Sequence, residues 1–382
     1  MPTRRAMTHR ERVLVALNHQ EPDRVPIDFG GTRDSSIHVA GYERLKRHFG
    51  IEAPNIISDR MMQCVLVDDP ILEKLDVDTR SIVPGRPDKS PDVELDETTY
   101  CDEWGVTRHM PAGSYWYDLM ECVLFGEITA QDILRYPWPD PTDPGRTRGV
   151  RQMALELREK GDYALVLSVS IGTVHVSQYL RGFADWYKDM ASDRKLMGTL
   201  MDAITDVTME MARRLMLEVG DLVEIVFTGD DLGTQNGLQV HPDTYREVIK
   251  PRHARFLRQV KEMCPHAKIG FHSCGSVYSV LADLIDVGVQ ALNPIQVPAG
   301  DMDPIRMKRE YGDKLAFWGA VDTQHVLPHG TPEDVKAEVE RRIAELGEGG
   351  GYMLCGVHNL QPDVPIGNIL TMYDHAREFG VY

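Results

Sequence analysis

The stretch LVEIVFTGDDLGTQ at residues 222–235 joins a short apolar run to a run of acids, glycines and amides. A short apolar run bounded by turn residues is typical of a strand that is buried on both faces of a parallel sheet. The same order, apolar run first and polar residues directly after it, recurs in KIGFHSCGS at residues 268–276. Longer amphipathic stretches alternate with such runs, so the pattern favours parallel strands connected by helices.

Outward from this stretch, eight apolar runs of strand length can be found along the chain. They cover residues 24–29, 77–83, 164–170, 222–228, 268–272, 289–293, 315–319 and 352–355. Helical stretches separate most of them, for example residues 242–264 and residues 332–346, the second with Thr331 as its N-cap. Because eight strands close a (β/α)8 barrel, we predict an α/β fold of the TIM-barrel class.

The start of the chain predicts a helix ahead of the barrel. Thr8 and Glu11 have the spacing of a capping box, in which each side chain satisfies an amide at the first turn. Val13, Leu14 and Leu17 continue this start as an apolar stripe, and Pro22 ends the predicted helix.

Between the second and third predicted strands lies a long segment at about residues 84–148, rich in proline, aspartate and aromatic residues. It offers few regular elements with which to bury a core of its own. We therefore expect an insertion that covers one end of the barrel, and a single domain over residues 1–382.

The composition narrows the class of partner. The chain has 42 Lys and Arg against 59 Asp and Glu, a net charge of −17, which argues against nucleic acid or an anionic membrane as the main partner. No apolar run approaches the ~18 residues of a membrane span, and the first arginines are not followed by the apolar region of an export signal. The six cysteines are scattered, which favours free thiols in a reducing compartment. We expect a cytoplasmic protein.

The residues directly after the predicted strands are unusually polar, and in barrels of this class the chemistry lies at the carboxyl ends of the strands. Three acids in these positions are candidates for catalysis: Asp230, Asp231 and Asp322. Four amides are candidates for substrate binding: Gln235, Asn293, Gln324 and Asn359. A loop that merely caps the next helix would also explain the acids after the fourth strand.

A metal site is predicted where the fifth and eighth strands end. His272 and Cys274 are two residues apart, so on an extended segment both side chains face the same side. Imidazole and thiolate together suit zinc, and a third donor must come from elsewhere in the fold. Cys355 and His358 are the candidates. If both bound, the closed set would be structural, whereas one alone would leave a position for water or substrate.

Other catalytic patterns are missing from the sequence. There is no Gly-X-Ser-X-Gly elbow, no phosphate-binding Gly-X-X-X-X-Gly-Lys-Ser/Thr loop and no Gly-X-Gly-X-X-Gly after the first strand. Hydrolase, kinase and dinucleotide-dependent activities are therefore poorly supported.

Five segments carry a family resemblance: MTHRERVLVALNHQEPDRVPIDF, GDDLGTQNGLQVHPDTYREVIKPRHARF, FHSCGS, LAFWGAVDTQHVLPHGTPEDV and VHNLQPDVPIGNIL. Together they resemble the uroporphyrinogen decarboxylase-like superfamily over nearly the whole chain. The decarboxylases carry an arginine-rich segment after the first strand, where this chain has GGTRD with Arg33 as the only basic residue. The His-X-Cys pair at residues 272–274 instead resembles the zinc pair of the corrinoid-linked methyltransferase branch.

The resemblance also bears on the third metal ligand. In the coenzyme M methyltransferases of this branch, the last zinc cysteine precedes prolines by four and seven residues. Pro362 and Pro365 stand in that relation to His358, while Cys355 lies three residues too early. The resemblance therefore favours His358 as the third donor, with Cys355 as a substitute or a fourth.

What the resemblance implies is a zinc-dependent methyltransferase that moves a methyl group between a small molecule and a corrinoid. The chain lacks the Asp-X-His-X-X-Gly segment that binds cobalamin, so the corrinoid (cobalamin) is expected on a separate partner protein. A methyl ether or alcohol is favoured as the donor, with Asp230 or Asp231 supplying or accepting the proton.

Three alternatives remain open at this point. The methyl group could pass from a methylcorrinoid to a thiol or folate. The chain could be a metal-free decarboxylase of the uroporphyrinogen type that uses Asp230 and His358 as proton donors. It could also be a non-catalytic barrel in which a closed zinc site connects two strand ends.

Overall fold

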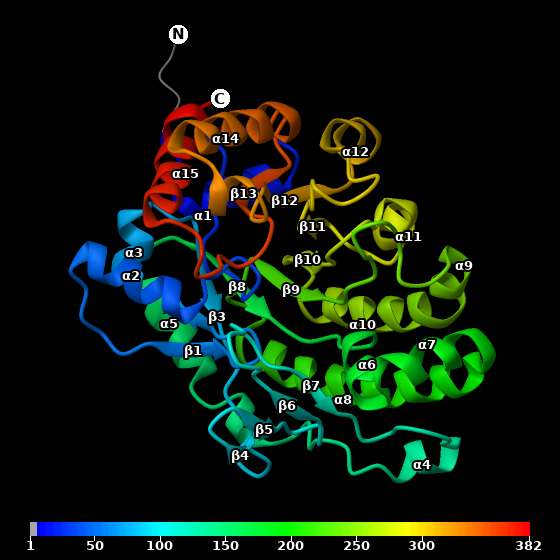
Figure 1. The fold of residues 1–382 in the computed structure, drawn as a ribbon. Coiled ribbons are helices and arrows are strands. Elements are labelled where there is room, and N and C mark those ends of the chain that lie inside the picture. Colours follow the sequence, from blue (N-terminus) through cyan, green and yellow to red (C-terminus); the bar gives the residue numbers. More distant parts are fainter. Residues whose placement is uncertain (1–5) are drawn as a thin grey trace.

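The computed structural model of this protein describes residues 6–382, and its centre is a curled parallel sheet (Figure 1). Within that range seven strands pair in the spatial order β13-β12-β11-β10-β9-β8-β3. Their bounds are β3 Thr79–Ile82, β8 Ala164–Ser168, β9 Ile225–Gly229, β10 Lys268–His272, β11 Ala291–Asn293, β12 Ala316–Val321 and β13 Tyr352–Gly356. Seven of the eight predicted strands are therefore confirmed, with ends shifted by a few residues.

The remaining predicted strand, residues 24–29, forms isolated bridges instead. Ile27 pairs with Leu354 of β13 in the parallel sense, and its carbonyl accepts a hydrogen bond from the amide of Asp78, next to β3. Pro26 has no N–H to donate, which limits the ladder that this segment can form. The segment nevertheless lies between the two edge strands and joins them through backbone hydrogen bonds.

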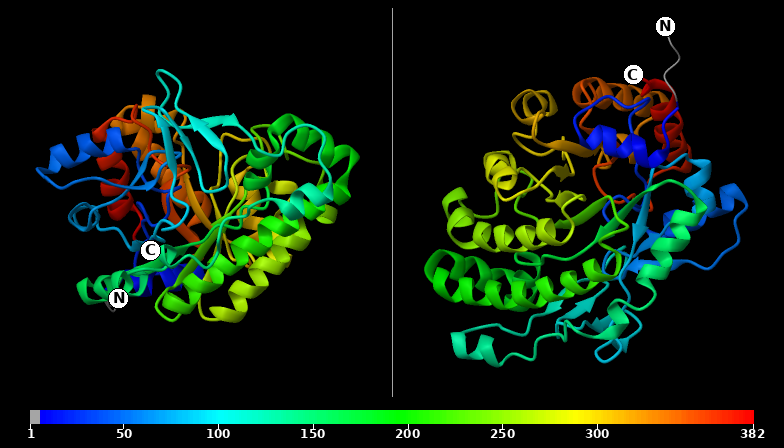
Figure 2. Two further views of the ribbon diagram at one scale, coloured as in Figure 1. Left: turned by 90° about the horizontal axis from the view of Figure 1, so that it is seen from below. Right: turned by 180° about the vertical axis from the view of Figure 1, so that it is seen from behind.

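Helices follow most of the strands and surround the sheet (Figures 1 and 2). They are α1 His9–Leu17, α2 Val39–Phe49, α3 Asp69–Lys74, α4 Ala130–Arg135, α5 Val150–Lys160, α6 His175–Arg181, α7 Phe183–Ser192, α8 Arg194–Val219, α9 Pro242–Thr244, α10 Lys250–Met263, α11 Leu281–Asp286, α12 Pro304–Tyr311, α13 Val326–His329, α14 Pro332–Leu346 and α15 Ile366–Phe379. Short turns of other helix types are η1 Pro144–Arg146, η2 Tyr245–Ile249 and η3 Tyr278–Val280. In the described part of the chain, no helix is both long enough and apolar enough to cross a membrane.

Of the two helices predicted between strands, one is continuous and the other is divided. The helix predicted over residues 332–346 is α14, and Thr331 caps it by accepting a hydrogen bond from the Asp334 amide. The helix predicted over residues 242–264 is divided into α9, the π-helical turn η2 and α10. Pro251, near the start of α10, has no N–H for the usual bond to the preceding turn, and the widened turn before it accommodates that loss.

The predicted insertion at residues 84–148 contains more regular structure than expected. Between β3 and β8 the chain forms an antiparallel sheet in the order β4-β5-β6-β7, and a separate hairpin precedes β3. The bounds are β1 Ile56–Asp59, β2 Cys64–Leu66, β4 Val93–Asp96, β5 Thr99–Cys101, β6 Thr107–His109 and β7 Asp118–Glu121. In Figure 1 the small sheet lies at the end of the molecule opposite the C-terminus. Tyr100 and Arg108 of this sheet line one cavity together with Ser168 and Gly229, which end β8 and β9.

Helix α1 covers the opposite end of the barrel. Its capping box at Thr8 is confirmed, and the helix ends at Leu17. Val13 and Leu17 belong to the same buried cluster as Phe227 and Trp318, whose side chains alternate with outward-facing neighbours along β9 and β12. The predicted apolar stripe of α1 therefore packs against side chains that fill the inside of the ring.

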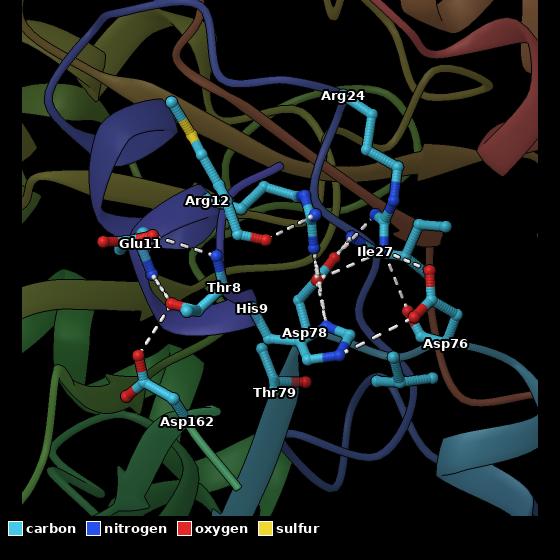
Figure 3. A network of polar contacts seen from close by, with 12 residues as sticks. Thr8, His9, Glu11, Arg12, Arg24, Ile27, Asp76, Asp78, Thr79 and Asp162 are labelled. Atoms are coloured by element: carbon cyan, nitrogen blue, oxygen red, sulfur yellow. Dashed lines mark hydrogen bonds and ion pairs between the residues drawn. The ribbon is translucent and has the colours of Figure 1, made fainter. Parts of the chain in front are cut away.

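A buried carboxylate connects α1 to the strands around it (Figure 3). Asp78 is fully buried and accepts hydrogen bonds from Arg12 Nη1 at 2.6 Å, Arg24 Nη1 at 2.8 Å and the Ile27 amide at 2.7 Å. His9 Nδ1 lies 2.7 Å from the same carboxylate. One side chain thus joins α1, the bridging segment 24–29 and the start of β3.

Asp78→Asn should destabilise the fold strongly. The variant leaves Arg12 and Arg24 without their shared buried carboxylate, and loss of one partner of a buried ion pair costs about 3–5 kcal/mol. The free energy of unfolding in guanidinium chloride measures the loss. Asp162→Asn is the control, because Asp162 is 45% exposed and pairs loosely with Arg10 at 3.9 Å, so it should cost less than about 1 kcal/mol. Equal losses for the two variants would contradict the importance given to Asp78.

Acid should remove the same stabilisation. Burial alone would raise the pKa of Asp78. The hydrogen bond to His9 and the charges of Arg24 and Arg12 lower the pKa by more than burial raises it, so the net pKa lies below the ordinary value of about 3.9. A lowered pKa in the folded state means that this stabilisation is present above the ordinary value and is lost as the pH falls through the folded value. The stability difference between wild type and Asp78→Asn should therefore shrink from about pH 5 to pH 3. A difference that grows on acidification would contradict this assignment.

Candidate metal centre

Three donors converge where β10 and β13 end. His272 is the last residue of β10, Cys274 follows it, and His358 lies two residues beyond β13. One ligand atom from each lies within 4.8 Å of the others. Cys274 Sγ is 3.4 Å from His272 Nε2, and tetrahedral zinc with ordinary bond lengths holds sulfur and nitrogen about 3.5 Å apart. The predicted convergence of His272 and Cys274 on a point near the last strand loop is confirmed.

Two asparagines orient the imidazoles. Asn293 donates its amide N–H to the Trp318 carbonyl, so its Oδ1 accepts from His272 Nδ1 at 2.7 Å. Asn359 donates to Cys64 Sγ at 2.9 Å, so its Oδ1 accepts from His358 Nδ1. Both rings then carry the proton on Nδ1 and present an unprotonated Nε2, as metal-binding histidines do. The two amides that were predicted to bind substrate thus contact the metal-site histidines.

Two carboxylates lie next to the donors. Asp34 is 3.6 Å from His272 Nδ1 and 3.9 Å from His358 Nε2, and Asp231 is 3.5 Å from His272 Nε2. Burial alone would raise the pKa of both acids. Neighbouring basic groups lower both pKa values by more than burial raises them, first His272 and then Arg33 for Asp34, and His175 for Asp231, so each pKa lies below its ordinary value. Both acids are therefore ionised, and their charge favours a cation in this group.

Cys274 is the donor that a metal would change most. Burial, followed by Asp231 and Asp34, raises the pKa of its thiol well above the ordinary value. Without a cation the thiol is therefore neutral, and metal binding at Cys274 releases a proton. A bound divalent ion would offset the repulsion between the two carboxylates and a Cys274 thiolate.

Cys355 does not join this group. It is fully buried on β13, pairs with Ala320 of β12, and belongs to the cluster that fills the inside of the ring with Trp318 and Met353. The expectation of Cys355 as a substitute or fourth ligand is therefore corrected. Strand β13 continues past Cys355 to Gly356, and side chains along a strand alternate between its two faces. The Cys355 side chain therefore still points into the barrel.

A cavity of about 240 Å³ opens beside the donors, and His272 forms part of its wall. Its titratable lining comes from Arg33, Asp34, Asp59 and His175, with serine hydroxyls between them. Arg33 lies 3.1 Å from Asp59 and 3.4 Å from Asp34, so it is neutralised by its own neighbours. The cavity therefore combines ionisable side chains with an apolar lining that includes Val65 and Phe227, and one of its walls is a metal donor.

This cavity continues into an outer space of about 460 Å³ beneath the small sheet. Besides Arg33, four arginines of the outer space pair with acids of the chain: Arg60 with Asp92 and Glu94, Arg108 with Asp102, Arg146 with Glu103, and the exposed Arg86 loosely with Asp92 at 3.9 Å. Paired arginines offer little free positive charge. The outer space is therefore not built to neutralise a substrate with many carboxylates.

The three predicted acids are placed differently from one another. Asp231 contacts His272, as described, without lining the cavity. Asp230 is fully buried and bonds to the amides of Val174 and His175 and to His253.

Asp322 is remote from the donors. It bonds to the amides of Gln324 and His325 and borders a separate surface depression, and it takes no part in the wall of the His272 cavity. Asp322 was a candidate for catalysis because it follows a strand at the same end as His272, and this expectation is corrected because it does not line the same cavity. The turn after β12 directs its carboxylate towards its own backbone.

Two predicted substrate-binding amides also lie elsewhere. Gln235 is exposed, donates to the Pro298 carbonyl and accepts from Gln296. Gln324 is exposed in the turn after β12. The structure brings neither to the cavity, because both loops fold outward against their neighbours.

Three residues were missed by the sequence analysis: Asp34, Asp59 and His175. Asp34 stood in the segment inspected for arginines and was not considered as an acid. Asp59 is the last residue of β1, which belongs to an antiparallel hairpin that the sequence analysis did not predict. Asp34 and His175 each lie five residues beyond a predicted strand, 24–29 and 164–170, and a wider inspection after these strands could have found them.

A comparison with protein families places these residues in a known group. A family model described as uroporphyrinogen decarboxylase (URO-D) matches residues 122–379. The chain belongs to this family. The matched region contains β8 to β13 and all three donors, so the family fold carries the candidate metal centre.

Among its relatives, the chain is 24% identical over 200 residues to a methylated-thiol–coenzyme M methyltransferase of Methanosarcina mazei, covering 52% of this chain and 50% of the relative. It is 24% identical over 183 residues to a methylcobamide:CoM methyltransferase of Methanosarcina barkeri, covering 47% and 49%. The chain spans about half the length of these curated relatives. A solved methyltransferase from Methanosarcina mazei shares the fold, with a TM-score of 0.69 at 18% identity over 98% of this chain and 99% of that one.

Replacing each of the two candidates for the third donor, His358 and Cys355, tests which of them binds the metal. His358→Ala should weaken zinc binding by at least the ~10-fold typical of damage to a ligand environment. Cys355→Ser should keep most of the affinity, because that side chain lies inside the ring. Competition with a chromogenic chelator measures both, and the reverse ranking would show that the barrel rearranges to bring Cys355 to the metal.

Proposed function

We propose that this protein is a zinc-dependent methyltransferase that moves a methyl group between a small molecule and a corrinoid carried by a separate protein. A methyl ether or an alcohol is the favoured donor. The observation that carries the proposal is the set of His272, Cys274 and His358 beside a cavity that ionisable side chains line in part. Three protein donors leave one position of a tetrahedral zinc for substrate, which is the pattern of a catalytic site.

The donor set fits zinc on the chemistry of the side chains. His272 and His358 each donate their Nδ1 proton to an asparagine, which leaves Nε2 free to bind a metal. The Cys274 thiol lies at a distance from His272 Nε2 that suits two ligands of one zinc ion. When bound, zinc supplies Lewis-acid activation of an oxygen or stabilises a thiolate. In the favoured direction the C–O bond of the donor would break with its electron pair on oxygen, and that oxygen would take up a proton from water. The methyl group would pass to the electron pair of a cobalt(I) corrinoid on the partner protein.

The acids of the site divide the remaining work. Asp231 is held ionised, so it serves as a negative charge that balances the metal. Asp230 has no open path to the cavity and supports the loop. Asp34 and Asp59 face the cavity and are the side chains placed to contact substrate.

The relatives support the corrinoid link. Their names describe methyl transfer between coenzyme M and a methylated thiol or methylcobamide. The second candidate function, transfer from a methylcorrinoid to a thiol or folate, follows those names more closely. We favour the donor-side reaction because this chain presents His358 as its third donor, in the place of the last zinc cysteine of the coenzyme M methyltransferases.

Two other functions fit the structure less well. A decarboxylase that protonates its substrate from Asp230 needs that acid in the cavity, whereas Asp230 is fully buried among hydrogen-bond donors. A structural zinc needs a fourth protein ligand, whereas Cys355 lies inside the barrel. We also propose that the insertion forms one domain with the barrel, since both line the outer space, and that the protein is cytoplasmic, a proposal that its six free cysteines support.

The proposed function predicts bound metal and methyl transfer. Purified protein should hold about one zinc per chain by elemental analysis. With cob(I)alamin and a panel of methyl ethers and methanol, it should form methylcobalamin, followed by absorbance. His272→Ala should abolish the reaction, and Asp322→Asn, remote from the cavity, should leave it unchanged.

Three outcomes would redirect the assignment. Demethylation of methylcobalamin by a thiol or folate, with no reaction of ethers, would establish the second candidate. Decarboxylation of uroporphyrinogen by metal-free protein would overturn the methyltransferase. Zinc without any of these reactions would favour a structural site.

A further inference from the structure

A chain of alternating acids and imidazoles runs from the core to the metal centre. His253 of α10 lies 3.2 Å from Asp230, and Asp230 lies 3.3 Å from Nδ1 of His175. Nε2 of His175 lies 3.2 Å from the next acid, Asp231. Asp231 in turn accepts a hydrogen bond of 2.7 Å from the amide of Cys274.

His175 lies in the middle of this chain of residues and has a carboxylate partner on each side. Each of its ring nitrogens faces a carboxylate oxygen, and an imidazole can donate from both nitrogens only when it is protonated. Burial lowers the pKa of His175, but Asp231 and Asp230 raise it well above its ordinary value. The ring is therefore a cation held between two anions, with no N–H left for a substrate.

The two carboxylates on either side of His175 make different contacts. Asp230 is fully buried and accepts from the amides of Val174 and His175, which fixes the start of α6. Asp231 faces the metal donors instead, through the Cys274 amide and His272 Nε2. Without a cation between them, two neighbouring carboxylates repel, and the less buried one, Asp231 at 29% exposed, is the acid that holds Cys274.

We propose that His175 is a positioning residue of the metal centre, which holds Asp231 against the Cys274 amide and so keeps the thiol beside His272. The inference rests on the zinc-dependent function proposed above. It assigns His175 no direct contact with the metal. The side chain lines the cavity and is 24% exposed, yet both of its polar atoms point away from the cavity, into the chain of acids.

The first test needs no metal. Hydrogen exchange of the peptide over residues 272–276 in the metal-free protein reports the Cys274 amide, whose partner is Asp231. His175→Gln should speed this exchange about 10-fold or more, because a neutral amide supplies no positive charge to offset the repulsion between the two acids. Asp231→Ala, which leaves the start of α6 intact, should give the same result and serves if His175→Gln does not fold. The matched control is His375→Gln, whose ring pairs with Glu340 at 2.8 Å on a distant helix and should change nothing.

The second test is zinc affinity by chelator competition. His175→Gln should weaken binding about 10-fold, as loss of support around a metal ligand does. In an Asp231→Ala background the same change should have no further effect, because His175 acts through Asp231. A merely structural histidine would lower the melting temperature and weaken binding equally in both backgrounds.

The outcomes separate the two proposals. Wild-type protein without zinc affinity overturns the proposed function, while hydrogen exchange still decides whether His175 positions Cys274. Zinc-binding wild type with unchanged exchange and affinity in His175→Gln overturns the positioning of Cys274 alone. Additive effects of His175→Gln and Asp231→Ala on zinc affinity would also overturn it.

Discussion

The closure of the barrel depends on one buried carboxylate. Asp78 accepts from Arg12, Arg24 and the Ile27 amide, and these three belong to the first helix and to the segment that replaces the eighth strand. An ionised group at this depth is tolerated only with such partners. Since residues 24–29 pair with too few backbone bonds to form a strand, the ion pairs supply what the ladder lacks.

That closure determines the composition of the metal centre at the opposite end. Asp34 follows the bridging segment, whereas His272 and His358 follow β10 and β13. These elements are neighbours only because the ring is closed, which brings a carboxylate from residue 34 within 3.6 Å of one imidazole and 3.9 Å of the other. The charge around the donors is thus a product of topology.

Adjacent residues can serve opposite ends of one network, as Asp230 and Asp231 show. The first is buried among amides and His253, and the second contacts the metal donors. His175 lies between them and is bonded to both. Stability and ligand geometry are therefore coupled within one short loop, which is common where a rigid scaffold supports a reactive site.

Local sequence determined the features that need only neighbours along the chain. Seven strands, the capping boxes at Thr8 and Thr331, and the shared side of His272 and Cys274 follow from periodicity and capping, which act over a few residues. The placement of His358 near that pair was also anticipated, from a family resemblance. Only the tertiary structure decided that Cys355 points into the barrel, because this depends on where β13 ends and on which side faces the ring. It likewise decided the outward turn of Asp322 and the approach of Asp34, Asp59 and His175, since contacts between distant segments depend on how the ring closes and leave no mark in the local pattern.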